Sequence, residues 1–282
     1  MEFPIRIPFG KVVEQIVVWM TDNFATFFDG ITATVNVALH QISAFLLWVP
    51  WPVTILVFMV VAWRFAGRKV ALITGFFLFA MGAFGLWEHG MKTLALVATS
   101  VLIAVLLGIP LGIVSARNDT TDKIVRPIMD GMQTIPSFVY LIPAVMFFGI
   151  GNVPGVMATV IFALPPMVRL TNLGIRQVSK ETVEAGKAFG CTEWQLLTKI
   201  QIPLALPAIM AGVNQTVMMA LSMVVIAAMI GAGGLGSPIL YAIQRVELGI
   251  GVEAGLGILF TAIILDRILQ GYSAKQKKAR HL

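Results

Sequence analysis

The side chains of this sequence that are best suited to charge-based chemistry gather in one polar segment, Ser179–Pro203, of an otherwise apolar chain. The segment reads SKETVEAGKAFGCTEWQLLTKIQIP, whereas only 12% of the whole chain is charged. Its charged side chains are Lys180, Glu181, Glu184, Lys187, Glu193 and Lys199. Carboxylates and ammonium groups form ion pairs and charge-assisted hydrogen bonds, so we interpret the segment as a docking surface. The alternative is an ordinary solvated loop between two membrane spans.

Two short helices joined by a turn would position these side chains. Ser179 is a suitable N-cap for the first helix, and Gly190 supplies the left-handed residue that ends it. Thr192 and Gln195 form a capping box that begins the second helix, which we expect to end before Pro203. Because charged helices flanked by long apolar runs cannot lie in hydrocarbon, the pair is predicted at a face of the membrane.

The spacing within this segment resembles the EAA loop of binding-protein-dependent ABC importer permeases. The motif of that family is E-A-A, then G after three residues, I after nine more, and L-P after one more. This chain has residues at the same spacing, namely Glu184–Gly186, Gly190, Ile200 and Ile202–Pro203. Two positions depart from the pattern, where glycine replaces the second alanine and isoleucine replaces the leucine. The resemblance extends from about residue 91 to about residue 271 and is closest to the permease subunits of glycine betaine/proline importers. The stretches 133–137 (QTIPS) and 231–236 (GAGGLG) look like that subgroup.

The resemblance implies a role for each residue of the first helix. Glu184 would make a charge-assisted contact with a separate ATPase subunit or cap the helix against it. Ala185 and Gly186 would allow close approach, Lys187 would lie at the rim, and Gly190 would set the angle to the next helix. The resemblance further implies a homodimer of this permease in the bacterial cell membrane, an ABC ATPase subunit dimer, and an extracytoplasmic substrate-binding protein.

Composition independently indicates a polytopic α-helical membrane protein. The chain has 282 residues, of which 58% are hydrophobic, and a mean hydropathy of +0.89. A soluble domain would carry roughly twice this charged fraction. Cys191 is the one cysteine, which excludes an internal disulfide and a cysteine-based metal site. The first ten residues lack the features of a cleavable signal peptide.

Apolar runs predict about seven transmembrane helices. Residues 9–43 mix polar and apolar positions too evenly for a span, and their helical spacing indicates an amphipathic helix in the interface or a helix packed on the bundle. Gly30 and Thr32 could separate a second short segment there. We divide the chain into an amphipathic segment (1–43), accessory transmembrane helices (44–90) and a permease core (91–282). We expect Pro50 and Pro52 to kink the first of the runs, which cover 44–63, 70–87, 93–114, 135–148, 154–170, 205–230 and 249–265.

The distribution of Lys and Arg predicts the orientation in the membrane. If the chain alternates sides and the loop at 64–69 is cytoplasmic, 16 basic residues lie on that side and 4 on the other. The N-terminus is then outside, and the C-terminus and the Ser179–Pro203 segment are inside, where ATP is found. This asymmetry also accounts for the net charge of +6 without a nucleic-acid partner.

Polar and helix-breaking residues inside the runs are candidates for a translocation path. Pro136 interrupts a span where freed carbonyl groups could line a cavity. Asn214, Gln215 and Ser222 place polar groups within the sixth run, and Met218 could contribute to a compliant gate. Interhelical hydrogen bonds and plain packing are the alternatives for these residues.

Catalysis and cofactor binding are not expected of this chain. It lacks the G-x-x-x-x-G-K-[ST] phosphate loop, so ATP would be bound by the partner. Residues 231–236 match G-x-G-x-x-G but follow an apolar helix rather than a strand, which favours a turn or re-entrant bend. An ion-coupled secondary carrier would need carboxylates at mid-membrane depth, and Glu253 and Asp266 lie at the ends of the last run. A channel is a third possibility and would need no cytoplasmic helix pair.

Overall fold

A computed structural model describes residues 9–280, and every regular element in that part of the chain is helical, as expected. The α-helices are α1 (Phe9–Asn23), α2 (Ala25–Trp48), α3 (Trp51–Ala66), α4 (Arg68–Ala83), α5 (Trp87–Arg117), α6 (Asp119–Thr134), α7 (Leu141–Phe148), α8 (Asn152–Arg176), α9 (Lys180–Ala188), α10 (Glu193–Gln195), α11 (Ile202–Ala228), α12 (Gly236–Arg245) and α13 (Leu248–Arg280). A 3₁₀-helix, η1 (Ser137–Tyr140), precedes α7, and a π-helix, η2 (Leu196–Gln201), precedes α11.

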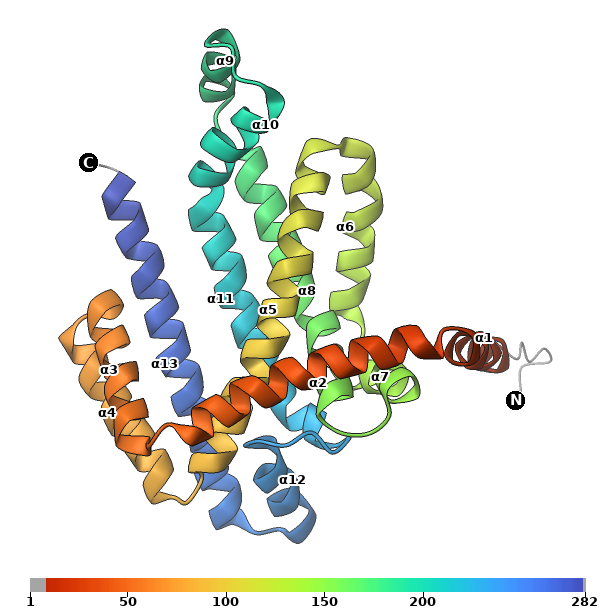
Figure 1. The fold of residues 1–282 in the computed structure, drawn as a ribbon, viewed down its shortest axis with the longest axis vertical. Coiled ribbons are helices and arrows are strands. Elements are labelled where there is room, and N and C mark those ends of the chain that lie inside the picture. The colour runs from red at the N-terminus through yellow and green to blue at the C-terminus, as the bar shows by residue number, and fades with distance from the viewer. Residues whose placement is uncertain (1–8, 281–282) are drawn as a thin grey trace, which may run out of the picture.

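The centre of the molecule is a bundle in which α8 packs between α5 and α11 (Figure 1). Glycines allow these helices to approach closely. A Cβ on Gly112 of α5 would lie 2.6 Å from Thr171 Cβ and 2.8 Å from the Val168 carbonyl oxygen of α8. A Cβ on Gly174 of α8 would lie 2.7 Å from Ala208 Cβ of α11. These small residues therefore serve close helix contacts within the chain.

The two ends of the bundle carry different helices. Figure 1 places α9 and α10 at one end and α12 at the other. The last helix, α13, runs toward the end that carries α9, and near its terminus Lys275 Nζ donates to the Arg64 carbonyl oxygen at 3.4 Å. Lys275 of α13 and Arg64 of α3 therefore lie near one another.

The span count is close to the prediction of about seven. Among the described residues, five helices are long and apolar enough to cross a membrane: α2, α5, α8, the continuous helix Glu193–Ala228, and α13. A sixth candidate is α6 with the η1–α7 segment, although a bend of 107° separates its halves. Helix α3 is apolar but shorter.

The predicted kinked span over 44–63 is wrong, because the chain forms two helices there. Helix α2 ends at Trp48, Val49 and Pro50 are extended with ψ near 126° and 136°, and α3 begins at Trp51. The residue before a proline is sterically kept from the helical region of φ and ψ. Because Val49 precedes Pro50, α2 ends there. Pro52 then lies in the first turn of α3, where its missing N–H is tolerated.

The predicted span over 135–148 forms only a short segment, η1 with α7, which follows a sharp bend at the first two residues of that run. Ile135 and Pro136 are extended, with ψ of 129° and 132°, between α6 and η1. The same pre-proline restriction explains this break. Pro136 is exposed at the bend, while Tyr140 Oη donates to the Met132 carbonyl oxygen at 2.5 Å and ties the two sides of the bend together.

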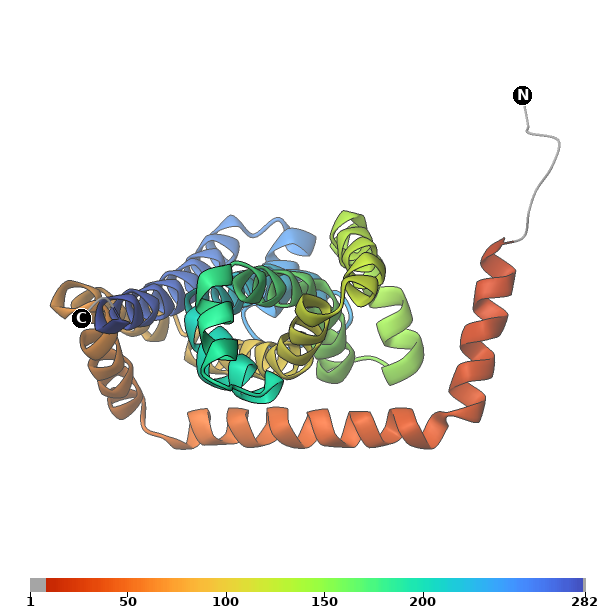
Figure 2. The same cartoon turned by 90° about the horizontal axis from the view of Figure 1, so that it is seen from above.

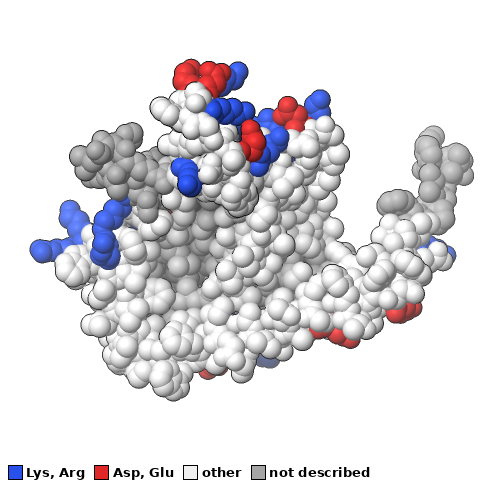
Figure 3. Space-filling model, turned by 45° about the horizontal axis from the view of Figure 1, so that its top comes forward, with Lys and Arg blue, Asp and Glu red and all other residues white. Residues whose placement is uncertain are grey.

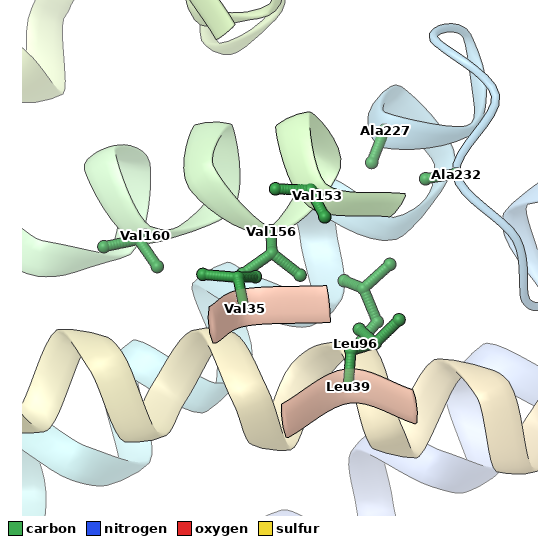
Figure 4. Close-up of a cluster of buried hydrophobic side chains, with 8 residues drawn as sticks. All are labelled: Val35, Leu39, Leu96, Val153, Val156, Val160, Ala227 and Ala232. Atoms are coloured by element: carbon green, nitrogen blue, oxygen red, sulfur yellow. The ribbon is translucent and has the colours of Figure 1, made fainter. Parts of the chain in front are cut away.

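The first helices lie beside the bundle rather than within it. Figures 1 and 2 show α2 crossing the other long helices, with α1 at its far end. Val35 and Leu39 of α2 pack on Leu96 of α5 and on valines of α8 (Figure 4). Packing on the bundle, one of the two alternatives, therefore holds for α2. The expectation that residues 9–43 are too polar for a span is wrong for this helix, because Ala25–Trp48 is long and apolar enough to cross a membrane.

The break expected near Gly30 and Thr32 is wrong, because both residues lie inside α2 and the first break is at Phe24. Thr32 Oγ1 donates to the Phe28 carbonyl oxygen at 2.9 Å, so its hydroxyl is satisfied within the helix. The boundary proposed at residue 43 falls inside α2 as well. The division into three segments stays a prediction.

The glycine-rich stretch 231–236 is a turn between α11 and α12, as favoured from the sequence. Its backbone is bonded to neighbouring helices: Leu235 N–H donates to Thr93 Oγ1 at 2.8 Å, and Gly233 N–H donates to Asn152 Oδ1 at 2.7 Å. Gly234 has a φ of +96°, and a Cβ there would lie 2.5 Å from Thr93 Oγ1. These glycines serve close packing at a turn.

Candidate functional site: the polar hairpin and the α11–α13 groove

The predicted helix–turn–helix, here called the polar hairpin (residues 179–203), forms with the expected caps. Ser179 Oγ accepts from Thr182 N–H at 3.3 Å. Gly190 has a φ of +79°, and the next residue, Cys191, donates its N–H to the Gly186 carbonyl oxygen at 3.1 Å, which completes a Schellman motif. Both hydrogen bonds of the capping box between Thr192 and Gln195 are present. Local side-chain chemistry therefore determines where the hairpin turns.

The second helix of the hairpin does not end before Pro203, so that prediction is wrong. Helix α10 leads into η2 and then into α11, which makes one continuous helix over Glu193–Ala228. A proline removes an N–H donor and crowds the preceding turn, and a π-helical stretch relaxes that turn by widening it. The polar hairpin is thus joined directly to a membrane-spanning helix, with no loop between them.

The two sides of α9 have different environments. Gly186 is buried, and a Cβ there would lie 2.7 Å from Ile200 Cδ1 and 2.9 Å from Leu196 Cδ1 of η2. Glu184 and Ala185 are exposed. Within the chain, the missing side chain of Gly186 allows α9 to pack on η2, while Glu184 and Ala185 remain accessible to a partner.

Ion pairs attach the polar hairpin to the end of α5. Glu193 Oε1 lies 3.3 Å from Lys187 Nζ of α9, and Glu193 Oε2 accepts from Arg117 Nη2 of α5 at 3.2 Å. All three side chains are substantially exposed, so each pair contributes about 1 kcal/mol or less. Their effect is to orient the hairpin more than to stabilise it. Figure 3 shows charged side chains gathered over this end of the molecule and a mostly uncharged surface below it.

A second set of charges joins the ends of α5, α6 and α8. Arg176 Nη2 lies 2.8 Å from Asp119 Oδ1 and donates to the Ser115 carbonyl oxygen at 2.9 Å. Between these helix ends and the polar hairpin lies a cavity of about 450 Å³, with Glu184 and Lys187 in its lining. In the part of the chain that the structure describes, no three His, Cys, Asp or Glu side chains come together as a metal site.

Two exposed aromatic residues of the polar hairpin were not predicted as site residues. Phe189 is 90% exposed and Trp194 is 68% exposed, on either side of the Gly190 turn. An aromatic side chain exposed outside the apolar bundle indicates a protein contact, because such residues contribute strongly to interfaces. Their position on either side of the glycine turn is the sequence signal that could have identified them.

Three of the five predicted path residues line one groove between α11 and α13. The groove has a volume of about 530 Å³. Its lining comprises Pro207, Met210, Ala211, Asn214, Gln215 and Met218 of α11 with Gln270, Ser273 and Ala274 of α13.

Asn214 also makes the interhelical hydrogen bond that was the alternative to a path role. Its Nδ2 donates to Asp266 Oδ1 of α13 at 3.0 Å. Ser222 is exposed further along α11 and donates to the Met218 carbonyl oxygen at 3.0 Å. Pro136 lies apart from these residues, at the α6–η1 bend.

The bundle of long apolar helices with an appended polar hairpin defines a multi-pass membrane protein. Residues 108–277 match the family described as "Binding-protein-dependent transport system inner membrane component". The chain belongs to this family, which confirms the resemblance drawn from the EAA-like spacing. This membership does not favour an ion-coupled secondary carrier.

Curated relatives are similar over nearly the whole chain. The "Glycine betaine/proline betaine transport system permease protein ProW" of Escherichia coli (strain K12) is 50% identical over 264 residues, which is 94% of this chain and 75% of that protein. The "Glycine betaine transport system permease protein OpuAB" of Bacillus subtilis (strain 168) is 47% identical over 272 residues, 96% of each chain. A solved structure of the MetNI methionine ABC transporter, in an inward-facing conformation, has a chain with a TM-score of 0.59 at 22% identity, covering 69% of this chain and 95% of that one. This last likeness concerns the fold alone.

Proposed function

We propose that this chain is the membrane-spanning permease subunit of an ATP-driven importer for a compatible solute such as glycine betaine. The observation that carries the proposal is the polar hairpin, which continues without a break into the helix Glu193–Ala228. A push on such a hairpin is transmitted along a rigid helix into the bundle. The substrate class rests on the relatives named above, whose printed names specify glycine betaine.

An ABC ATPase subunit dimer is the proposed partner of the polar hairpin. Glu184 and Ala185 are exposed on α9, and Phe189 and Trp194 extend from the turn beside them. This surface combines aromatic anchors with charged residues at the rim, as stable interfaces do. The chain would perform no bond chemistry itself, and the ATPase subunits would bind and hydrolyse ATP.

Two copies of the permease would form the translocation path. Ile209 and Val213 of α11 pack with Val105 and Ile109 of α5, whereas Gln215 is exposed. At about 100° per residue, the exposed positions of α11 lie on the face turned away from α5. That face carries the exposed residues Ala211, Gln215 and Ser222, which would meet a second copy.

The proposed orientation follows the basic residues. The polar hairpin and the end of α13 would lie in the cytoplasm, and α12 would lie outside, where an extracytoplasmic substrate-binding protein would deliver the solute. The charged hairpin end and the largely uncharged flank in Figure 3 support this arrangement.

Co-expression with a candidate ATPase subunit and binding protein tests the proposal. We expect the ATPase to co-purify with the permease in detergent, and proteoliposomes of the assembled complex to accumulate radiolabelled glycine betaine only when ATP is supplied. A control without the binding protein should accumulate little. Accumulation driven by an ion gradient without ATP, or a permease that retains no ATPase, would contradict the proposal.

A further inference from the structure

A polar pocket, here called the α2 pocket, lies where α2 crosses α5 and the start of α8, beside the glycine-rich turn. Its volume is about 190 Å³. Its polar lining comes from three helices: Asn36, His40 and Ser43 of α2, Lys92 of α5 and Asn152 of α8. All of these side chains except the half-buried Ser43 are exposed, so the pocket is open to a ligand. The cavity beside the polar hairpin and the α11–α13 groove share no lining residue with it.

The apolar part of the lining is buried and packed. Leu39 of α2 and Leu96 of α5 belong to one buried cluster and lie side by side in Figure 4. Ala95 of α5, which also lines the α2 pocket, is buried as well. The polar side chains therefore stand on helices whose contact is already fixed, which holds them around one space.

The three polar side chains of α2 make no hydrogen bond to any residue that the structure describes. Asn36, His40 and Ser43 recur at helical spacing, so they share one face of α2. Two other hydroxyl groups of this helix bond to the carbonyl oxygen four residues earlier, Thr32 at 2.9 Å and Thr34 at 2.8 Å. The hydroxyl group of Ser43 is not used in this way and remains available to a ligand.

The opposite wall of the pocket adds further donors. Lys92 Nζ donates to Glu88 Oε1 at 2.6 Å, which occupies one of its three N–H bonds. Asn152 Oδ1 accepts from Gly233 N–H at 2.7 Å, so its Nδ2 group is left to donate. A Cβ on Gly233 would lie 3.9 Å from Lys92 Cδ and 3.6 Å from Asn152 Oδ1, which places the two side chains next to each other.

A space lined by so many donors suits a ligand group with several acceptor oxygens. An ammonium group, two amides, a hydroxyl and an imidazole face the α2 pocket, and no carboxylate lines it. Charge-assisted hydrogen bonds from such donors favour phosphate and carboxylate oxygens. A hard metal cation would instead need carboxylate or carbonyl ligands, so this set of side chains favours an oxyanion.

Exposed tryptophans place the α2 pocket near the surface of the membrane. Trp48 ends α2 with 81% of its surface exposed, and Trp51 begins α3 with 54% exposed. Tryptophan is enriched at the membrane–water interface. Ser43 lies five residues before Trp48, and Lys92 lies five residues after Trp87 at the start of α5, about 8 Å along each helix axis. The donors are therefore close to the depth of the lipid headgroups.

From this placement we propose that the α2 pocket binds the phosphodiester group of a membrane phospholipid. Lys92 supplies the positive charge, and Asn36 and Ser43 donate from the opposite side. Val37 and Phe45 of α2 are 60% and 63% exposed and offer an apolar surface for the acyl chains. The bound lipid would join α2 to the bundle. The inference requires only that the chain lies in a membrane, and it does not depend on which solute is transported.

Lipid binding to the purified complete transporter tests the inference. The transporter is delipidated in detergent and titrated with dioleoylphosphatidylglycerol, and native mass spectrometry measures the affinity of the first lipid bound to each permease. Lys92→Gln should weaken this affinity about tenfold, the effect of losing a charge-assisted hydrogen bond. Asn36→Leu should weaken it about threefold, the effect of losing one neutral hydrogen bond. Lys92→Arg should retain most of the affinity.

Lys123→Gln is the matched control, because Lys123 is an exposed lysine of α6 that does not line the α2 pocket. This variant should bind the lipid as the wild type does. Equal affinities in the wild type, Lys92→Gln and Asn36→Leu would overturn the inference. The carboxylate of a solute is the rival ligand: if Lys92→Gln abolished binding of radiolabelled glycine betaine and left the lipid affinity unchanged, the inference would also be overturned. Failure of ATP-driven uptake in the wild type would contradict the proposed function and not this inference.

Discussion

Replacing Gly186 should impair transport by disturbing the packing inside the polar hairpin. The added Cβ would lie 2.7 Å from Ile200 Cδ1 and 2.9 Å from Leu196 Cδ1. Carbon atoms in contact prefer about 3.5–4.0 Å, so the overlap is about 1 Å at each methyl group. Both methyl groups end flexible side chains, which can rotate away at a cost on the order of 0.5–1.5 kcal/mol each.

The expected penalty for Gly186→Ala is therefore about 1–3 kcal/mol of packing between α9 and η2, the usual range for an overfilled core. Since about 1.4 kcal/mol corresponds to a tenfold change in a rate or equilibrium, uptake per transporter should fall by about tenfold. Gly186→Val adds two more methyl groups at the same place and should be more severe. The polar hairpin would tilt on η2, so the exposed residues of α9 would no longer meet the ATPase in register.

Glycine betaine uptake at matched permease levels is the assay. Ile200→Val removes the nearer methyl group, so Gly186→Ala combined with Ile200→Val should recover part of the lost uptake. Gly131→Ala in α6 is the matched control, because a Cβ there meets no atom within 4 Å. The reasoning would be refuted by equal uptake in Gly186→Ala and Gly131→Ala, or by a double variant that is no better than Gly186→Ala alone.

Three further predictions concern the polar hairpin and the bundle. Glu184→Lys and Gly190→Asp should leave the permease in the membrane but uncouple it from ATP hydrolysis, and normal uptake at normal protein levels would contradict this. Phe189→Ala should weaken binding of the ATPase by about fivefold or more, the effect of losing an interface anchor of at least 1 kcal/mol. Co-purification of the ATPase equal to that of the wild type would count against the docking surface. Gly112→Ala places a Cβ 2.8 Å from the Val168 carbonyl oxygen, a backbone atom that cannot rotate away. This substitution should lower the free energy of unfolding by about 1–3 kcal/mol. An unchanged midpoint of thermal unfolding would disprove the tight contact between α5 and α8.

Much of the polar hairpin could be predicted from the sequence because its signals are local. Ser179, Gly190 and the Thr192–Gln195 box act on backbone groups within a few residues, and all of them take the predicted roles. The predicted helix end before Pro203 failed because a proline restricts only the turn before it. That turn is widened into the π-helix η2, and no side-chain pattern in the sequence predicts a π-helix.

Prolines also explain why the predicted spans did not all form. Hydropathy identifies apolar runs but does not show whether a proline will kink a helix or end it. At Pro50 and Pro136 the preceding residue is extended, and the helix ends. At Pro110 the helix α5 continues, because neighbouring helices support it on several sides. The outcome depends on packing partners that are distant in the chain.

Composition and short-range signals by themselves determined that this is a multi-pass helical membrane protein with a charged helical hairpin at one end. These properties follow from hydropathy, charge and capping, which act over a few turns of chain. The tertiary structure alone decided that Asn214 meets Asp266, that α2 packs across the bundle, and that Phe189 is exposed while Gly186 is buried. Each of these depends on how helices far apart in the chain are placed against one another, because burial and pairing across a bundle are set by the packing of whole faces.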